Sequence, residues 1–557
     1  MSALAAWLER RLPRLPQGIF AALLAALVLA AALPAFTGLP PVDRDEPSFA
    51  QSAKQMRASG NLVDIRFQDG TRYKKPVGIY WLQAATAAAL GPKGDRVIWH
   101  YRLPSLLGIL AAVLLGARIA AGFGGPAAGQ AAGLMLAGSF LLLAEAHLAT
   151  TDAVMLAAIL AAQAVLARLY RAAHAAAFLR AALKPLPVGS LVLFWGALAA
   201  TVLLKGPVGA LVLGLTALAL ALIHRRAGWL MALRPGWGLL GLALAVLPWF
   251  VAITVVSGGA FWREALGHDL LGKVVAAQED HGAPPGTYLA LLWITFFPAS
   301  IPLALTLPRI ARLWRRPGVI FALAWVVPAW LVFELNPTKL MHYVMPLYPG
   351  LALAAALAWA EGALALRRWH WILAGLLTAL PVAVLLAAAG FGARLGHLPW
   401  LPVGLGLLAI GLGAVFAARA QAEGRPLAAL LGLWLAGAGF AGGLLGAAAA
   451  IPALWPARAI VALAQPSAAC PARPIVTDGY DEPSLVFLAP ATELATTPAG
   501  VAQAMAKDRC TLGIVSDPAQ FLAAAAAAGL APQAVGQVKG LNLGTGRMVA
   551  LTGYLLP

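Results

Sequence analysis

Cysteine and charged residues are both scarce in this chain. The 557 residues include only two cysteines, Cys470 and Cys510, and neither belongs to a closely spaced metal-binding pair. This count excludes a zinc ribbon and a CxxC redox motif. Charged residues make up 11% of the chain and hydrophobic residues 61%, with a mean hydropathy of +0.81. A water-soluble globule cannot bury so large an apolar share, so we expect the main solvent of this protein to be lipid.

Acidic residues are fewer than basic ones. The chain has 22 Asp and Glu against 40 Lys and Arg, which gives a formal net charge of +18. It lacks the continuous basic face with interleaved aromatic residues that nucleic-acid binding requires, and this absence excludes nucleic acid as a partner. The basic residues instead form short clusters between long apolar runs, which is the pattern of a multi-pass membrane protein.

Thirteen apolar runs are long enough to be considered as membrane-spanning helices. They cover approximately 17–37, 101–120, 124–144, 150–167, 187–204, 207–223, 237–256, 288–307, 317–335, 343–363, 371–391, 399–417 and 427–450. Every second gap is basic, as at Arg118, Arg168 and Arg316, and these gaps are predicted to be cytoplasmic. The intervening gaps are then periplasmic, and an odd number of spans places the N-terminus inside and the C-terminal region outside.

Two segments leave alternatives open. Residues 76–91 are apolar but short for a span, and we interpret them as a helix at the interface or against the bundle, because a crossing there would reverse the later loops. The first run follows a basic start and contains small residues near 31–35, so a cleavable signal peptide is the alternative to a first span.

The chain changes character after about residue 456. Strand-like runs at 474–477, 485–488 and 511–515 and a helix-like run at 518–529 predict a small α/β domain at 457–557. Both cysteines fall in this domain on the predicted oxidising side, where a disulfide and two buried thiols are both open interpretations. The expected fold is therefore mainly α: a membrane domain at 1–456 with a first periplasmic loop at 38–100, followed by this domain.

Chemically active residues concentrate in the predicted periplasmic gaps. In the first loop, Asp45 and Glu46 precede a helix-like segment at 47–59, where the helix dipole favours a carboxylate. The loop returns to the membrane with a basic cluster that contains Tyr73 and Lys75, and Tyr80 follows. The dipole accounts for one carboxylate without any chemistry, and simple ion pairing across the loop is the alternative to a functional site.

The later gaps add further candidates. Asp152 lies at the mouth of an apolar helix, where an ionisable group is costly unless it faces a cavity or a partner. The other candidates are Lys205 at a helix junction, Arg263 in the loop 257–287, and Lys339, His342 and Tyr343 at an outer helix start. Cations on the predicted outer side run against the positive-inside trend, so they favour an anionic ligand such as a lipid phosphate.

Taken in order, these residues resemble a known family. Asp45-Glu46, Lys75-Pro76 followed by Tyr80-Trp81, the helix with Asp152, Lys205-Gly206 and the segment 339–346 are similar to the bacterial aminoarabinose transferases. That family belongs with the protein O-mannosyltransferases in the GT-C glycosyltransferase superfamily. The resemblance covers residues 15–350 by motif and the whole chain by layout.

The resemblance implies a fold of about thirteen spans with a periplasmic C-terminal domain in the bacterial inner membrane. It implies an inverting transfer from a polyprenyl-phosphate-linked sugar to a periplasmic acceptor: lipid A, another envelope lipid or glycan, or a protein. Asp45 then corresponds to the catalytic aspartate, Asp152 to a second carboxylate and Lys75 to the lysine on the donor phosphate, while Tyr343 lines the same pocket. The chain departs from the family at 47–49, where Pro-Ser-Phe stands in place of an early aromatic residue, and the C-terminal domain has no matching motif.

The chemistry is consistent with these residue types. A carboxylate can take the acceptor's proton, and cations can stabilise charge on the departing phosphate, so the reaction needs no metal, although the acidic residues could hold a divalent ion. A transporter or flippase for a lipid-linked substrate is the main alternative, but such proteins usually carry ionisable residues near the midplane and internal repeats. A non-enzymatic envelope scaffold is the second alternative.

Overall fold

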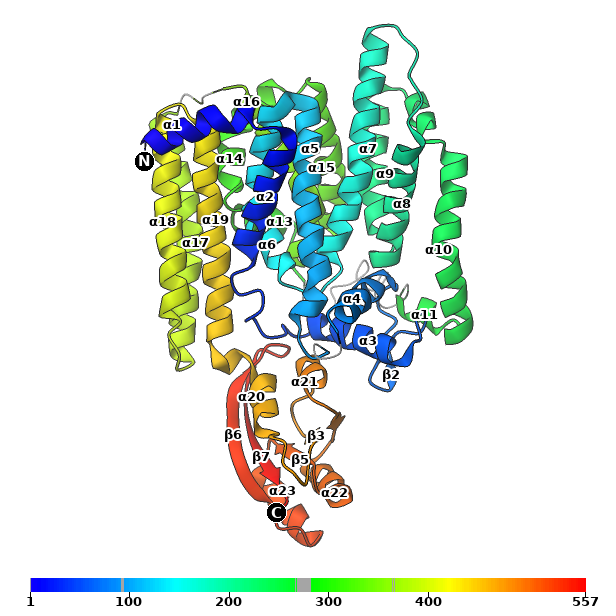
Figure 1. The fold of residues 1–557 in the computed structure, drawn as a ribbon, viewed down its shortest axis with the longest axis vertical. Coiled ribbons are helices and arrows are strands. Elements are labelled where there is room, and N and C mark those ends of the chain that lie inside the picture. Colours follow the sequence, from blue (N-terminus) through cyan, green and yellow to red (C-terminus); the bar gives the residue numbers. More distant parts are fainter. Residues whose placement is uncertain (1, 92–94, 266, 268–281, 363, 365) are drawn as a thin grey trace.

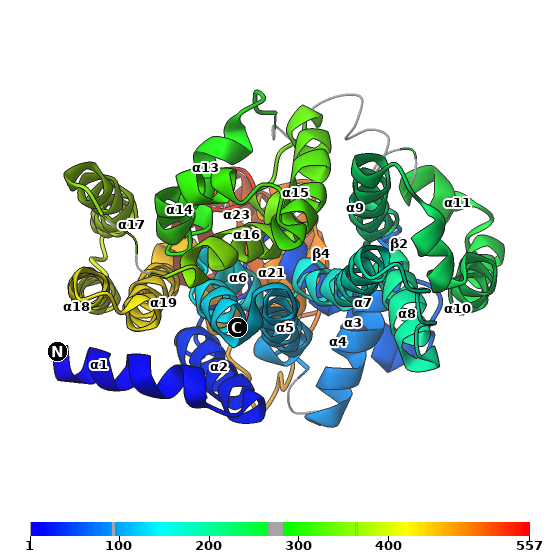
Figure 2. The same ribbon diagram turned by 90° about the horizontal axis from the view of Figure 1, so that it is seen from above.

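The computed structural model describes residues 2–91, 95–265, 267, 282–362, 364 and 366–557. Long helices form a bundle, and a smaller part with a β-sheet extends from one end of it (Figure 1). Seen from above, α5 and α16 lie in the middle of the bundle, with α10 at one edge and α17 and α18 at the other (Figure 2). The mainly helical fold with a small C-terminal α/β part, expected from the sequence, is confirmed.

The bundle is built from helices that coincide with the apolar runs. They are α2 (Gln17–Ala32), α5 (Trp99–Ala137), α6 (Phe140–Ala146), α7 (Asp152–Phe178), α8 (Val188–Lys205), α9 (Val208–His224), α10 (Pro235–Ser257), α13 (Thr287–Thr295), α14 (Ser300–Arg312), α15 (Pro317–Leu335), α16 (Tyr348–Ala360), α17 (Arg368–Arg394), α18 (Trp400–Ala422) and α19 (Pro426–Ala450). Shorter elements are α1 (Ser2–Arg11), η1 (Leu12–Arg14), η3 (Gly228–Leu233), α11 (Ala260–Trp262), η5 (Met341–Leu347) and η6 (Pro452–Leu454).

Within the described residues, nine helices are long and apolar enough to cross a membrane, or ten if the bent pair α13 and α14 forms one span. The protein is therefore a multi-pass membrane protein. The count of thirteen spans stays a prediction. Two of its runs, α2 and α9, form helices of only 16 and 17 residues. Two other runs, 101–120 and 124–144, fall in the single long helix α5 and in α6 beside it.

The helix α5 contains a reversal of the chain. Gly124 and Gly125 depart from helical geometry, and Gly125 has a φ of +74°, which favours glycine because it has no Cβ. Beyond this point the chain packs against its own first half: a Cβ on Gly129 would come within 2.7 Å of Ala121. The two halves of α5 therefore run alongside each other as a hairpin, which separates the predicted runs 101–120 and 124–144.

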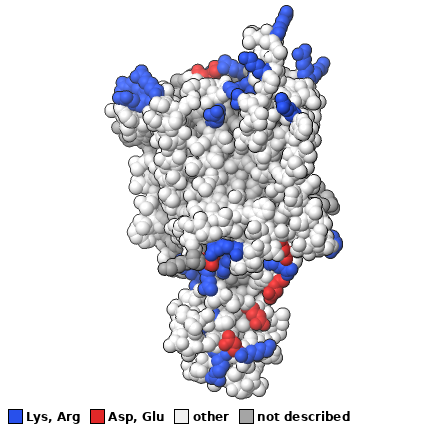
Figure 3. Space-filling model, turned by 45° about the vertical axis from the view of Figure 1, so that its right-hand side comes forward, with Lys and Arg blue, Asp and Glu red and all other residues white. Residues whose placement is uncertain are grey.

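The two ends of the bundle differ in charge. Lys and Arg gather at the end opposite the sheet, while acidic and basic residues are mixed at the end that carries the sheet (Figure 3). We call the first the arginine end, represented by Arg118, Arg171 and Arg316, and the second the loop end, represented by α3 and α4. The sequence predicts that the arginine end is cytoplasmic and the loop end periplasmic.

The first loop folds against the loop end of the bundle. It contains α3 (Asp45–Ser59), the short strands β1 (Arg66–Phe67) and β2 (Gly70–Thr71), and α4 (Gly78–Ala89). Helix α4, which covers most of the apolar segment 76–91, packs against α3, α5 and α8. The approach to α8 is close, since a Cβ on Gly78 would lie 2.8 Å from the Leu203 carbonyl oxygen. Residues 266 and 268–281 of the predicted loop 257–287 lie outside the described residues.

The C-terminal part forms a five-stranded sheet in the order β4-β3-β5-β7-β6. Its elements are α20 (Pro456–Leu463), β3 (Ile475–Thr477), α21 (Pro483–Leu488), β4 (Thr492–Leu494), α22 (Pro498–Lys507), β5 (Leu512–Val515), α23 (Pro518–Ala527), β6 (Gln533–Asn542) and β7 (Arg547–Leu555). Strand β3 runs parallel to β4 and β5, while β7 is antiparallel to β5 and β6. Cys470 and Cys510 form a disulfide, which decides between the two open interpretations.

The prediction of a strand at 485–488 is wrong, because these residues form most of α21. In a strand, residues two apart point to the same face. Here Leu485 packs in the core of the sheet, whereas Phe487 packs with the membrane bundle, so the two side chains must point in different directions. A helical turn that begins at Pro483 satisfies both contacts, since proline is well accommodated in the first turn of a helix.

Candidate active site

His342 lies at the centre of a group of charged residues at the loop end. Its ring nitrogens are 3.6 Å from the Glu145 carboxylate and 3.9 Å from the Asp152 carboxylate. It also interacts electrostatically with Lys205, Asp45 and Lys75. These residues come from α3, α6, α7, the end of α8, η5 and the loop before α4. The fold thus brings together groups that are nearly 300 residues apart in the chain.

Asp152 and Lys205 form a nearly buried ion pair within this group. The Lys205 ammonium lies 2.6 Å from Oδ1 of Asp152, and their side chains are only 12% and 5% exposed respectively. Asp152 is the first residue of α7, where the positive end of the helix dipole favours a carboxylate. Lys205 also lies over the ring of Tyr343, with the ammonium 5.3 Å from the ring centroid. The two charges of this pair therefore compensate each other, as a low-dielectric setting requires.

Asp45 is the accessible carboxylate of the group. Its side chain is 72% exposed, and Oδ1 lies 3.6 Å from the Arg72 guanidinium. Arg72 is itself nearly buried, with its guanidinium 4.8 Å from the centroid of the Phe49 ring. A solvent-accessible carboxylate beside a nearly buried cation is a suitable proton acceptor for an incoming hydroxyl group. Lys75 is half-buried in the same loop.

Glu46 has a different environment from the neighbouring Asp45. It is 1% exposed, and Arg102 donates to both of its oxygens at 2.7 and 2.9 Å. The backbone N–H groups of Val42 and Ala149 donate to the same carboxylate at 2.8 and 2.9 Å. Four donors occupy the four acceptor positions of a carboxylate. The contacts of Glu46 therefore favour a positioning role, and the catalytic role predicted from the sequence stays a prediction.

Arg102 and Glu145 were not among the residues selected from the sequence. Arg102 is fully buried in α5 and also donates to the carbonyl groups of Phe36, Leu39 and Pro40. It therefore ties the end of the first span to α3. The sequence contains a sign of this role, since Arg102 lies inside an apolar run and a buried arginine is costly without partners. Glu145 is 4% exposed, accepts a hydrogen bond from the Thr150 hydroxyl and carries the same kind of signal.

The two predicted pocket tyrosines are buried beside the group. The Tyr73 hydroxyl donates to Asp64 at 2.7 Å, and Tyr80 is fully buried next to Arg72. Burial raises the pKa of each phenol to about 12, so both are neutral near pH 7. Asp64, the partner of Tyr73, is a further residue of the first loop that the sequence did not single out.

Lys339 and Arg263, which the sequence predicts as phosphate ligands, have surroundings that differ from those of Lys205. The Lys339 ammonium donates to the carbonyl groups of Glu334 and Asn336 at 2.8 and 2.6 Å, next to the last residue of α15. This contact caps the negative end of the helix dipole and gives the Lys339 ammonium a structural partner, while its role as a phosphate ligand stays a prediction. Arg263 is exposed just after α11. In the part of the chain that the structure describes, no three His, Cys, Asp or Glu residues form a metal-binding group.

The C-terminal part docks on the first loop close to Asp45. Asp43 accepts hydrogen bonds from the backbone N–H and the hydroxyl group of Ser484 at 2.8 and 2.6 Å. Phe487 packs edge-on against Tyr101, with ring centroids 5.5 Å apart. Burial raises the pKa of Asp43 to about 7, although the Ser484 hydrogen bonds act in the opposite direction. A titratable group therefore lies in the contact between the two parts of the chain.

No protein-family model matches the chain. Its sequence is 28% identical over 311 residues to the undecaprenyl phosphate-alpha-4-amino-4-deoxy-L-arabinose arabinosyl transferase 1 of Pseudomonas fluorescens, a match that covers 54% of this chain and 51% of that protein. The undecaprenyl phosphate-alpha-4-amino-4-deoxy-L-arabinose arabinosyl transferase of Pseudomonas aeruginosa is 28% identical over 317 residues, which are 56% of this chain and 54% of that protein. The chain spans about half the length of the curated relatives it matches.

The fold is similar to that of a solved transferase over almost the whole chain. ArnT from Cupriavidus metallidurans, crystallised with undecaprenyl phosphate, superposes with a TM-score of 0.75 at 20% identity, covering 95% of this chain and 97% of that chain. The resemblance to the aminoarabinose transferases expected from the sequence is therefore confirmed as a similarity of sequence and of fold.

Proposed function

We propose that this chain is a membrane glycosyltransferase that moves a sugar from a polyprenyl-phosphate carrier to an acceptor at the periplasmic face. The observation that supports this most is the grouping of Asp45, Lys75, Asp152 and Lys205 around His342, where the first loop meets the helix ends. Two lysines face carboxylates at one end of a membrane bundle, and this arrangement suits a substrate that carries both a lipid phosphate and a reacting sugar.

The reaction is a single displacement with inversion at the anomeric carbon. The acceptor oxygen forms a bond to that carbon while the bond from the carbon to the phosphate oxygen breaks, and the phosphate leaves with the electron pair. Asp45 takes the proton from the acceptor hydroxyl, because it is the exposed carboxylate of the group. Lys75 stabilises the charge that develops on the phosphate, since an ammonium stabilises a leaving anion best where water is partly excluded.

Lys205 is a second phosphate contact that is held in place before substrate arrives. Its ion pair with Asp152 fixes the ammonium, and the Tyr343 ring beneath it limits its movement. His342 and Glu145 complete the surroundings of Asp152. This preorganisation lowers the cost of aligning the donor.

The similarity to the Pseudomonas arabinosyl transferases supports undecaprenyl-phosphate-linked 4-amino-4-deoxy-L-arabinose as the donor to test first. The acceptor is an envelope molecule that presents a reactive oxygen at the periplasmic surface of the inner membrane: lipid A, another lipid or glycan, or a protein. The location that follows is the bacterial inner membrane, with the loop end in the periplasm.

The decisive test is transfer by purified protein. Wild type given the labelled donor and an envelope extract should transfer label, and Asp45→Asn should lower the rate by at least about a hundredfold, the low end for a general base. Asp69→Asn is the matched control, because Asp69 is an exposed carboxylate in the same loop. Transfer at the wild-type rate by folded Asp45→Asn would contradict the assignment. Movement of intact donor across a proteoliposome membrane without transfer would instead identify a flippase.

A further inference from the structure

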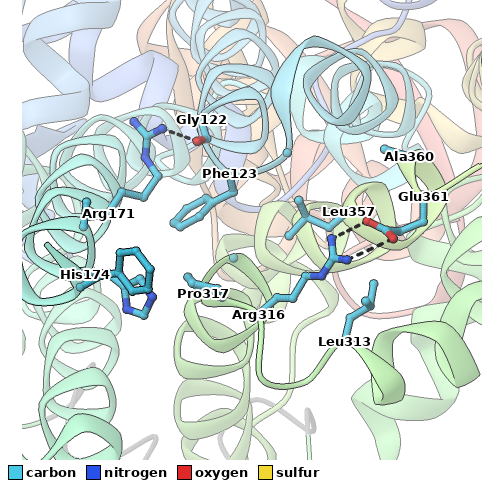
Figure 4. Close-up of a pocket in the computed structure, with 14 residues that line it drawn as sticks. Gly122, Phe123, Arg171, His174, Leu313, Arg316, Pro317, Leu357, Ala360 and Glu361 are labelled. Atoms are coloured by element: carbon cyan, nitrogen blue, oxygen red, sulfur yellow. Dashed lines mark hydrogen bonds and ion pairs between the residues drawn. The ribbon is translucent and has the colours of Figure 1, made fainter.

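A cavity of about 430 Å³ lies at the arginine end, away from the group around His342. Its walls come from the turn of the α5 hairpin, the last turns of α7, the junction of α14 and α15, and the end of α16. Arg171 and His174 stand on one side and Arg316 and Glu361 on the other, with Phe123 between them (Figure 4). We infer that this cavity binds the phosphate-bearing headgroup of an anionic lipid in the membrane leaflet at the arginine end.

The charges around the cavity favour an anion. Arg316 and Glu361 neutralise each other through a two-point ion pair at 2.5 and 3.3 Å. On the opposite side, Arg171 interacts electrostatically with two further arginines, Arg168 and Arg118. Three guanidinium groups close together repel one another, so a phosphate placed among them relieves that repulsion.

The geometry leaves donors for such a phosphate. Arg171 uses one N–H for the Gly122 carbonyl oxygen, and its guanidinium lies 5.7 Å from the centroid of the Phe123 ring. A guanidinium has five N–H donors in a fixed plane, so this contact fixes its orientation without using its capacity. Pro317 and Gly318, at the first turn of the 19-residue helix α15, also line the cavity, and a helix N-terminus adds a positive partial charge there.

The remaining walls favour a lipid over a free phosphate ion. Phe123, Phe178, Leu313 and Leu357 line the same cavity and offer apolar surface for the start of an acyl or isoprenoid chain. Its volume falls in the range of ordinary ligand sites, roughly 300 to 1,000 Å³. A ligand with an anionic head and an apolar tail matches both kinds of surface. This site is separate from the proposed transfer reaction.

The test measures lipid binding to the detergent-purified full chain, with native mass spectrometry to detect bound lipid and thermal unfolding to detect stabilisation. Phosphatidylglycerol should bind and stabilise the protein, whereas phosphatidylcholine with the same chains and soluble glycerol 3-phosphate should not at equal concentration. Arg171→Gln should weaken phosphatidylglycerol binding about five- to tenfold, which is the expected loss for one arginine at an anionic lipid surface.

Two further variants complete the design. Arg118→Gln lowers the positive field without removing the hydrogen bond to Gly122, so it should weaken binding in the same direction even if Arg171→Gln disturbs the hairpin. Arg312→Gln is the control, because Arg312 is exposed at the same end and does not line the cavity. Equal binding of the two phospholipids, or binding that neither Arg171→Gln nor Arg118→Gln changes, would overturn the inference. Glycerol 3-phosphate that competes as well as the lipid would overturn the lipid assignment.

Discussion

Arg102→Met gives the sharpest test of how the first loop is held. In the wild type, Arg102 and Glu46 are 0% and 1% exposed, and the guanidinium donates to Glu46 and to three backbone carbonyl groups. Methionine keeps an apolar side chain of similar length but leaves Glu46 with only its two backbone donors. Breaking a buried ion pair from one side typically costs about 3–5 kcal/mol, because an uncompensated charge stays buried.

That loss is a large share of the stability of a folded protein, which is on the order of 5–15 kcal/mol. Thermal unfolding in detergent, followed by tryptophan fluorescence, should therefore begin several degrees lower in Arg102→Met. The double variant Arg102→Met with Glu46→Gln should recover most of the loss, since it removes the orphaned charge. Arg394→Met is the control, because Arg394 is exposed in the last turn of α17. A double variant no more stable than Arg102→Met would refute the reasoning.

Three further outcomes are expected. Burial raises the pKa of Asp43 from 3.8 to about 7, so its contribution to docking is complete below about pH 4 and is lost as the pH rises through 7. The protein should therefore unfold at a lower temperature at pH 8 than at pH 6. Asp43→Asn should flatten this pH dependence. Cys470→Ser should destabilise the sheet by about 4 kcal/mol, as expected for a crosslink across 40 residues, measured as faster proteolysis between 466 and 557. Reporter fusions at positions 175 and 480 should give cytoplasmic and periplasmic signals, respectively, and the reverse result would overturn the proposed side of the reaction.

The sequence predicts where the helices lie and which ionisable residues lie at their ends, because membrane insertion leaves clear signals. Apolar runs mark helices, and an ionisable residue at a helix end must have a partner. Asp152 and Lys205 both lie at predicted outer ends of spans, so they belong to the same layer of the bundle, and the structure joins them at 2.6 Å. Which partners meet within that layer depends on how the helices pack, and one sequence does not contain that information.

Lys339 illustrates the limit. A lysine beside an outer helix end can reach a ligand in the site or turn back to the carbonyl groups at the end of its own helix. The sequence shows the same lysine at the same position beside the span in both cases, so it does not distinguish them. The structure selects the second, since the ammonium contacts the carbonyl oxygens of Glu334 and Asn336. The strand assigned at 485–488 failed for a related reason: α21 contacts two separate cores, and this tertiary requirement overrides local β propensity.

The different roles of Asp45 and Glu46 follow from helix geometry. Asp45 and Glu46 are consecutive residues in the first turn of α3, so their side chains point about 100° apart and enter different surroundings. Glu46 points inward and is saturated by Arg102 and two backbone N–H groups, whereas Asp45 is 72% exposed. The buried member fixes the helix start, and the exposed member is thereby held at a defined position while it keeps access to water and substrate. Replacing Glu46 should therefore reduce transfer by displacing Asp45, even though Glu46 itself is buried away from any substrate.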